Sequence, residues 1–214
     1  MIDRTTDILG LVDVQPTFMP GGELAVADGH DVVRAINQLT HHFDHAFATQ
    51  DWHPPGHSSF ASAHPGRKAY DTIDMPYGPQ VLWPDHALQN TANAALHRDV
   101  NLERVEVIIR KGFHRNIDSY STFFENDRRT ATGLDGWLRQ RGFRRVFLAG
   151  LATDFCVAWS AEDAVHLGYE VVVIEDACRG IGVSLPSGRT SMDEARERLA
   201  QLGVRFVPSW ELSA

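Results

Sequence analysis

The sequence is poor in cysteine, in long apolar runs and in positive charge. Its 214 residues include two cysteines, Cys156 and Cys178, which offer no disulfide framework and favour a reducing compartment. No apolar run approaches the roughly 20 residues that span a bilayer, and the first residues lack the profile of a signal peptide. The formal charge of −8 disfavours a phosphate-binding surface. We therefore expect a soluble, cytoplasmic protein with no nucleic acid or membrane partner.

Short apolar runs alternate with segments of helical periodicity. With 43% hydrophobic and 22% charged residues, the chain suits one compact domain. We expect strands at 8–14, 45–49, 105–111, 143–149, 170–174 and 204–207, and helices at 31–43, 134–141, 158–167 and 191–202. This alternation predicts an α/β fold with right-handed crossovers and a mainly parallel sheet.

A long segment between the second and third strands, at about 50–91, has no clear periodicity. It is dense in proline, glycine, serine and histidine. A loop of this length inside a compact domain is usually functional or disordered, and its aromatic residues argue against disorder. We therefore expect a functional insertion.

Four polar or reactive residues stand at the ends of predicted strands. Asp13 ends the first strand, Asp51 follows the second, Lys111 ends the third, and Cys156 follows the fourth. In parallel α/β sheets, ligands bind beyond the carboxyl ends of the strands. Together the four residues predict one site at that edge.

The segment 150–157, Gly-Leu-Ala-Thr-Asp-Phe-Cys-Val, has the layout of a turn that carries a nucleophile. Thr153 or Asp154 can cap the following helix, and Cys156 would lie in its first turn, which favours a thiolate. Lys111 could lower the thiol pKa and Asp13 could accept its proton. The alternative is that Cys156 is a small buried hydrophobe, Lys111 extends toward solvent and Asp13 caps a turn.

The insertion contains a carboxylate and several imidazoles at close spacing. Asp51-Trp52-His53 is followed by His57 and then by His86. Such a set suits Zn, Fe or Mn and leaves positions open for water or substrate. The alternative is a solvated polar loop with incidental histidines.

The sequence resembles the nicotinamidases (pyrazinamidases) of the isochorismatase-like cysteine hydrolases over nearly its whole length. The motifs that carry the resemblance are Val12-Asp13-Val14-Gln15 with Phe18, Gln50 to Pro54 with His57 to Phe60, Leu82 to His86, Arg110-Lys111-Gly112, Asp118 to Ser121 and Gly150 to Val157. The Asp-x-His motif with the later Trp-Pro-x-His is the part typical of nicotinamidases. The resemblance implies a three-layer α/β/α fold with a roughly six-stranded sheet, in a single domain 1–214 with a metal-binding insertion at about 50–91.

The resemblance also implies roles for individual residues. Asp13, Lys111 and Cys156 would be the catalytic triad. One divalent ion per chain would bind Asp51, His53 and His86, with His57 as a further candidate. A cis peptide before Ala152 would aim the amides of Ala152 and Cys156 at an oxyanion, and the pocket would be walled by Phe18, Trp83, Tyr120, Leu151 and Ala152. Two departures from the family pattern, Pro16-Thr17 and Ala87, bear on pocket detail.

The implied reaction is hydrolysis of nicotinamide to nicotinate and ammonia, and of pyrazinamide to pyrazinoate, through a cysteine thioester. This reaction belongs to NAD salvage and pyridine nucleotide biosynthesis. The chain would act as a monomer or homo-oligomer on this small molecule. Three alternatives stay open: a related amidase or isochorismatase with another small substrate, a metal-hydroxide hydrolase with a structural cysteine, and a non-catalytic binding domain.

Overall fold

Six parallel strands form the central sheet of the structure, a computed structural model that describes residues 1–212. Across the sheet their order is β5 (Val105–Lys111), β2 (Ala46–Asp51), β1 (Asp7–Val12), β6 (Arg145–Leu151), β7 (Glu170–Arg179) and β8 (Arg205–Val207). Every neighbouring pair runs parallel. The inner strands β1, β2 and β6 are buried almost throughout, as expected for a parallel sheet covered on both faces.

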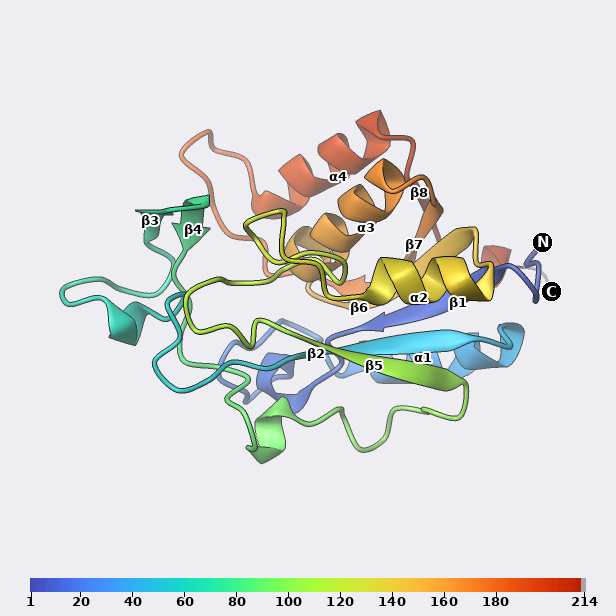
Figure 1. The fold of residues 1–214 in the computed structure, drawn as a ribbon, viewed down its shortest axis with the longest axis horizontal. Coiled ribbons are helices and arrows are strands. Elements are labelled where there is room, and N and C mark those ends of the chain that lie inside the picture. The colour runs from blue at the N-terminus through green and yellow to red at the C-terminus, as the bar shows by residue number, and fades with distance from the viewer. Residues whose placement is uncertain (213–214) are drawn as a thin grey trace.

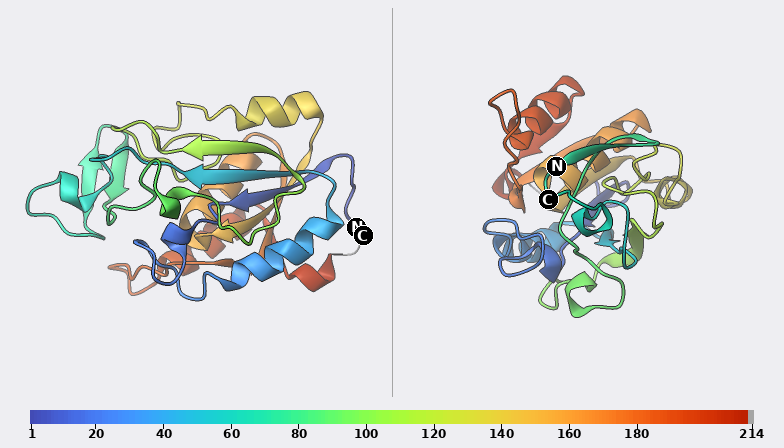
Figure 2. Two further views of the ribbon diagram at one scale, coloured as in Figure 1. Left: turned by 90° about the horizontal axis from the view of Figure 1, so that it is seen from below. Right: turned by 90° about the vertical axis from the view of Figure 1, so that its left-hand side faces the viewer.

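Helices cover both faces of this sheet. Helix α1 (Asp31–Leu39) lies on one face, and α2 (Leu134–Arg141) and α3 (Ala158–His166) lie on the other (Figure 1 and Figure 2). Helix α4 (Ser191–Gln201) packs beside α3. The predicted three-layer α/β/α fold with a mainly parallel, six-stranded sheet is confirmed.

Most differences from the predicted elements lie at their ends. Strand β1 stops at Val12, because Asp13 has a positive φ of 49° that breaks the extended backbone. Strand β7 continues to Arg179, so Cys178 lies within the strand and not after it. Helix α1 ends at Leu39 and continues only as one 3₁₀ turn, Thr40–His42.

The insertion contains an antiparallel hairpin that the sequence patterns do not reveal. Its strands are β3 (Thr72–Met75) and β4 (Gly78–Val81). Figure 1 shows them beyond the carboxyl ends of the main sheet. Their residues are mostly exposed or half-buried, so no apolar stripe marks them. Within residues 1–212, no helix is long and apolar enough to cross a membrane.

Candidate active site

The ends of the parallel strands bring four predicted residues together around one ammonium group. Lys111 Nζ, at the end of β5, lies 2.9 Å from Asp13 Oδ2, 3.0 Å from Asp51 Oδ1 and 3.4 Å from Cys156 Sγ. The Lys111 side chain is fully buried. Because β1, β2, β5 and β6 share one direction, their carboxyl ends meet at the same edge of the sheet.

Asp13 and Lys111 form a buried ion pair. Burial raises the pKa of the Asp13 carboxyl, and the charge of Lys111 partly offsets that rise. The Thr49 hydroxyl donates to Asp13 Oδ1 at 2.6 Å. For Lys111, burial favours the neutral amine, but the Asp13 and Asp51 carboxylates prevail and raise its pKa well above the ordinary value. The site therefore holds a charged lysine beside a carboxylate that is more basic than an exposed one.

Cys156 lies in a turn of a kind that was not expected. Thr153–Val157 forms one π-helical turn, and α3 begins only at Ala158. The predicted helix capping is wrong, because the Asp154 carboxylate instead accepts from the backbone N–H groups of Ile181 and Gly182, both at 2.9 Å. The peptide between Leu151 and Ala152 is cis, as the resemblance implies.

The protonation of Cys156 also differs from the expectation. Burial raises the pKa of this thiol well above its ordinary value, and the Lys111 charge offsets the rise only in part. Asp13 raises the pKa further, through its negative charge and through a hydrogen bond with the thiol. The position at the start of a helix therefore does not yield a resting thiolate. A thiol in this state needs a base to remove its proton, and the Asp13 carboxylate lies beside it.

A small pocket opens above the cysteine. It is lined by Phe18, Leu24, Asp51, Trp83, His86, Asp118, Tyr120, Ala152, Phe155, Cys156 and Ile181. The Trp83 and Phe155 rings meet edge to face with centroids 4.8 Å apart. This combination of apolar rings with a few converging polar groups suits a small aromatic ligand.

Four of the five predicted pocket residues line this cavity. Leu151 is the exception, since it is fully buried in β6 and contributes no surface to the pocket. Sequence reasoning missed Leu24, Phe155, Ile181 and Asp118. Phe155 and Asp118 lie inside motifs named above. Their closeness in sequence to Cys156 and Tyr120 could have identified them as pocket residues. Leu24 and Ile181 carry no such signal.

Asp51, His53 and His86 form a buried cluster that could hold a metal ion. The Nε2 atoms of His53 and His86 lie 3.0 and 3.2 Å from Asp51 Oδ2. Their Nδ1 atoms face the carbonyls of Gly112 and Pro84, each at 2.8 Å. Those carbonyls accept hydrogen bonds from the Nδ1–H groups, so the lone pair of each Nε2 points toward Asp51. One carboxylate and two imidazole nitrogens, with the rings held by backbone carbonyls, are suited to bind a divalent ion.

The position after Lys111 requires a glycine, Gly112. Its φ is +66°, and a Cβ there would lie 2.5 Å from His53 Cε1. A larger residue would strain the backbone and displace the ring that Gly112 supports through its carbonyl.

His57 is near the cluster but is already bonded on both nitrogens. Its Nε2 lies 3.0 Å from the His114 carbonyl and 3.1 Å from that of Ile117, and its Nδ1 accepts from the backbone N–H of Ser59. Its ring packs against that of His53, with centroids 4.3 Å apart. This geometry suits a residue that supports His53 better than a ligand.

The two departures from the family pattern are neighbours in space. The backbone N–H of Ala87 donates to Thr17 Oγ1 at 3.0 Å. Neither residue lines the pocket, although each adjoins one that does, Phe18 and His86. The departures therefore lie behind the pocket wall.

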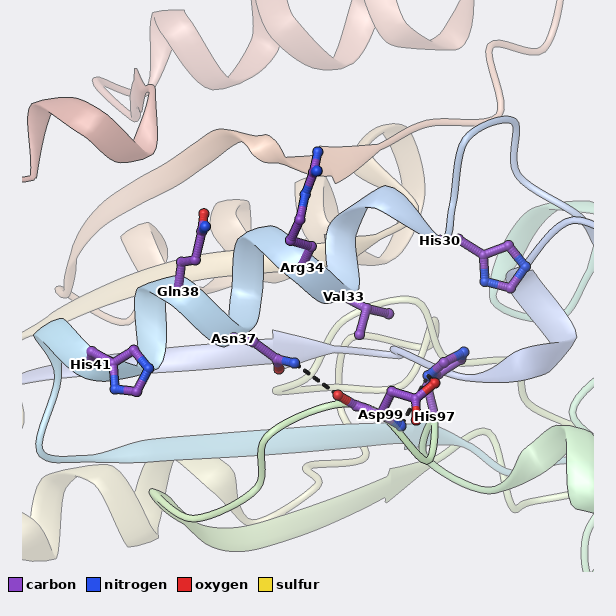
Figure 3. A pocket seen from close by; sticks show the side chains of 8 residues that line it. All are labelled: His30, Val33, Arg34, Asn37, Gln38, His41, His97 and Asp99. Atoms are coloured by element: carbon purple, nitrogen blue, oxygen red, sulfur yellow. Dashed lines mark hydrogen bonds and ion pairs between the residues drawn. The ribbon is translucent and has the colours of Figure 1, made fainter.

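A second hollow lies along α1 (Figure 3) and is lined by His30, Val33, Arg34, Asn37, Gln38, His41, His97 and Asp99. It shares no residue with the Cys156 pocket. In the part of the chain that the structure describes, two groups of side chains are spaced to hold a metal, and both lie elsewhere: Asp51, His53 and His86, and also His53, His57 and Asp118.

The three-layer α/β/α fold, with a buried cysteine, lysine and aspartate at the edge of its sheet, is consistent with a hydrolase of the isochorismatase-like class. A model of the Isochorismatase domain family matches residues 8–204, so the chain belongs to the isochorismatase-domain family.

Within that family, the chain is similar to nicotinamidases. It is 51% identical to the nicotinamidase of Acinetobacter baylyi, over 93% of this chain and 91% of that protein. The structure of the Acinetobacter baumanii nicotinamidase/pyrazinamidase superposes with a TM-score of 0.93 at 48% identity, covering 98% and 99% of the two chains. The structure of an L. infantum protein in complex with nicotinate superposes with a TM-score of 0.85 at 36% identity. The match covers 100% of this chain and 98% of that one. The resemblance that the motifs indicate is confirmed.

One further structure bears on the metal cluster. The pyrazinamidase of Pyrococcus horikoshii, solved in complex with zinc, superposes with a TM-score of 0.74 at 32% identity and covers 94% of this chain and 98% of its own. Together with the Asp51, His53 and His86 cluster, this relative favours a divalent metal.

Proposed function

We propose that this chain hydrolyses nicotinamide to nicotinate and ammonia, and pyrazinamide in the same way, through a thioester on Cys156. The observation that carries the proposal is the Lys111 ammonium, which lies 3.4 Å from Cys156 Sγ and 2.9 Å from Asp13 Oδ2 at the floor of an aromatic pocket. A nucleophile, a base and a fixed positive charge in one buried site suit acyl transfer. The nicotinamidase relatives support the choice of substrate.

In the first half of the reaction, Asp13 takes the thiol proton as Cys156 Sγ attacks the carboxamide carbon. The pKa of Asp13 is raised by burial, which makes this carboxylate a better proton acceptor. Lys111 stabilises the charges of both groups. The amides of Ala152 and Cys156 would stabilise the oxyanion, a contribution of roughly 3–4 kcal/mol per donor in comparable sites. The tetrahedral adduct then collapses, and Asp13 returns the proton to the departing ammonia.

In the second half, a water molecule attacks the thioester carbon while Asp13 accepts one of its protons. The C–S bond breaks, nicotinate is released, and the proton returns to the Cys156 sulfur. The same carboxylate thus serves as base and acid in both halves, so its position between Lys111 and Cys156 is needed throughout.

We assign Asp51, His53 and His86 as ligands of one divalent ion, Zn, Fe or Mn. When bound, this ion would supply a contact for the ring nitrogen and so orient the ring. Asp51 and His86 line the pocket itself, so these two side chains are within reach of a substrate bound there. The Gly112 and Pro84 carbonyls hold the two imidazoles in the tautomer that such an ion requires. We leave His57 out of the ligand set because its nitrogens are engaged.

We also infer the setting of this reaction. The chain would act as one domain, 1–214, with the insertion at 50–91 completing the site, and as a monomer or homo-oligomer. Its two cysteines are both free, which suits the reducing cytoplasm and a role in NAD salvage.

An ammonia-release assay tests the proposal. Protein as prepared, stripped of metal, and reloaded with Zn, Fe or Mn is given nicotinamide, and ammonia and nicotinate are quantified. We expect equal amounts of the two products, with turnover lost on stripping and regained on reloading. No ammonia from any preparation would reject nicotinamide as the substrate.

A further inference from the structure

The Asp154 carboxylate, in the turn that presents Cys156, is held by neutral donors from another part of the chain. Asp154 is 4% exposed, so its oxygens need partners within the protein. Oδ1 accepts from the Ile181 N–H at 2.9 Å, and Oδ2 accepts from the Gly182 N–H at 2.9 Å and from the Ser191 hydroxyl. Ser191 is the first residue of α4. The carboxylate thus ties the turn that carries Cys156 to the connection between β7 and α4.

The segment that Asp154 holds is Gly180-Ile181-Gly182, directly after β7. Within residues 1–212, the hydrogen bonds of this segment are the two that it donates to Asp154. Gly182 has a φ of +71°, and a glycine on either side of Ile181 gives the backbone little stiffness of its own. The Asp154 carboxylate is therefore the polar anchor that fixes the Ile181 backbone.

Ile181 forms part of the wall of the substrate pocket. It is half-buried and lines the same cavity as Cys156. The segment also lies closely against its anchor, since a Cβ at Gly180 would be 3.0 Å from Asp154 Oδ1. A shift of the carboxylate would therefore be passed directly to the pocket wall.

We propose that Asp154 is a positioning residue that sets the pocket wall at Ile181. Its backbone belongs to the turn that carries Cys156, while its side chain holds the Ile181 backbone. One residue thus fixes the wall relative to the sulfur, and the Ile181 side chain contacts the bound aromatic carboxamide. The inference rests on the function proposed above and adds a residue that acts on substrate binding.

A double-mutant cycle tests this role. KM and kcat for nicotinamide are measured for the wild type, Asp154→Asn, Ile181→Ala and the double variant. In Asp154→Asn an NH₂ group replaces one acceptor oxygen and faces a donor, so the segment must shift. Loss of a wall contact that substrate and transition state share should raise KM about 10-fold in each single variant and leave kcat within about twofold. Because both substitutions remove the same contact, the double variant should show no more than about the larger single effect.

Asp176→Asn is the matched control. Asp176 also accepts from a backbone N–H and a hydroxyl, both of Ser209 and both at 2.6 Å, but neither residue lines the pocket. This variant should keep the KM and kcat of the wild type. Thermal unfolding followed by circular dichroism reports the folded state of each variant. Asp154→Glu, which keeps both oxygens but displaces them by one methylene, replaces Asp154→Asn if that variant does not fold.

The outcomes are distinct. A kcat that falls by more than KM rises would show that Asp154 supports the Cys156 turn and not the pocket wall, which overturns the inference. KM increases that multiply in the double variant, or a lowered melting temperature with unchanged KM, would also overturn it. Each of these results leaves the proposed function intact. A wild type that releases no ammonia from nicotinamide would reject the proposed function, and the inference with it.

Discussion

The nucleophile group (Asp13, Lys111 and Cys156) and the metal cluster (Asp51, His53 and His86) share one edge of the sheet but are held in different ways. Lys111 ends β5, Asp13 directly follows β1, and Cys156 lies in the turn after β6. In the metal cluster only Asp51 belongs to the sheet. His53 and His86 come from the insertion, and backbone carbonyls orient their rings.

The two groups meet at a single contact, the 3.0 Å ion pair between Lys111 Nζ and Asp51 Oδ1. The other oxygen of Asp51 faces the two imidazoles. The Asp51 carboxylate thus contacts both groups. The strand ends position the nucleophile group, and backbone carbonyls orient the histidines of the metal cluster. We therefore expect bond cleavage and ligand orientation to be separable by mutation, and the predictions below test that separation.

The largest effect should come from the nucleophile. Cys156→Ala should lower kcat by at least about 10⁴-fold, because no other side chain at the site can form the acyl intermediate. Metal content should be unchanged, since Cys156 lies outside the metal cluster. Ammonia release and elemental analysis on one preparation measure both quantities.

Cys178→Ala is the control for that substitution. Burial in β7 raises the pKa of Cys178 to about 12, so its thiol stays protonated and unreactive. Its turnover should stay within about twofold of the wild type, and mass spectrometry should find the acyl adduct on the Cys156 peptide alone. An active Cys156→Ala enzyme would favour metal-hydroxide chemistry instead.

Removal of an imidazole should have the converse effect. His86→Ala should weaken metal binding by more than about 100-fold, exceeding the loss seen when a supporting partner of a ligand is removed. The fold should persist because His86 lies outside the sheet. His64→Ala is matched to it, as His64 lies in the same insertion but bonds the Ser58 carbonyl. Elemental analysis measures the metal content of both variants, and circular dichroism reports whether they are folded. Full metal occupancy in His86→Ala would show that the metal ligands are misassigned.

A substrate analogue probes the metal cluster without mutation. Benzamide has the scissile bond of nicotinamide but presents a C–H where the ring nitrogen stands. If the metal contacts that nitrogen, kcat/KM for benzamide should be lower by about 10²-fold, since the contact is lost but water can replace it. A metal-hydroxide enzyme would attack both carbonyls with little preference. Near-equal values would remove the ring-nitrogen contact from the mechanism.

The smallest effect should be a shift in pH dependence. Asp13 must be ionised to accept the thiol proton, so kcat/KM should fall as the pH drops through its pKa, which burial raises above 3.8. Thr49→Val removes a hydroxyl that donates to the ionised form, so the pKa of Asp13 should rise further and the acid limb should move to higher pH. A pH profile of both enzymes checks this. An unmoved limb would mean that Asp13 is not the base.

The six strands of the main sheet were predictable, apart from their exact ends, because short apolar runs are a feature of local sequence. Six short runs between helical segments predict a parallel sheet, and that topology alone brings Asp13, Asp51, Lys111 and Cys156 to one edge. The hairpin β3–β4 was not predictable in this way, because its strands pair mainly with each other and bury little apolar surface.

The sequence by itself determined the fold class, the reactive residue types and the side of the sheet on which they lie. These follow from periodicity and chain direction, which are properties of neighbouring residues. Tertiary structure alone decided the protonation of Cys156, since burial among distant segments outweighs the local effect of a helix start. It also decided which partners the nitrogens of His53 and His57 bond, because each ring faces a backbone carbonyl far away in the chain.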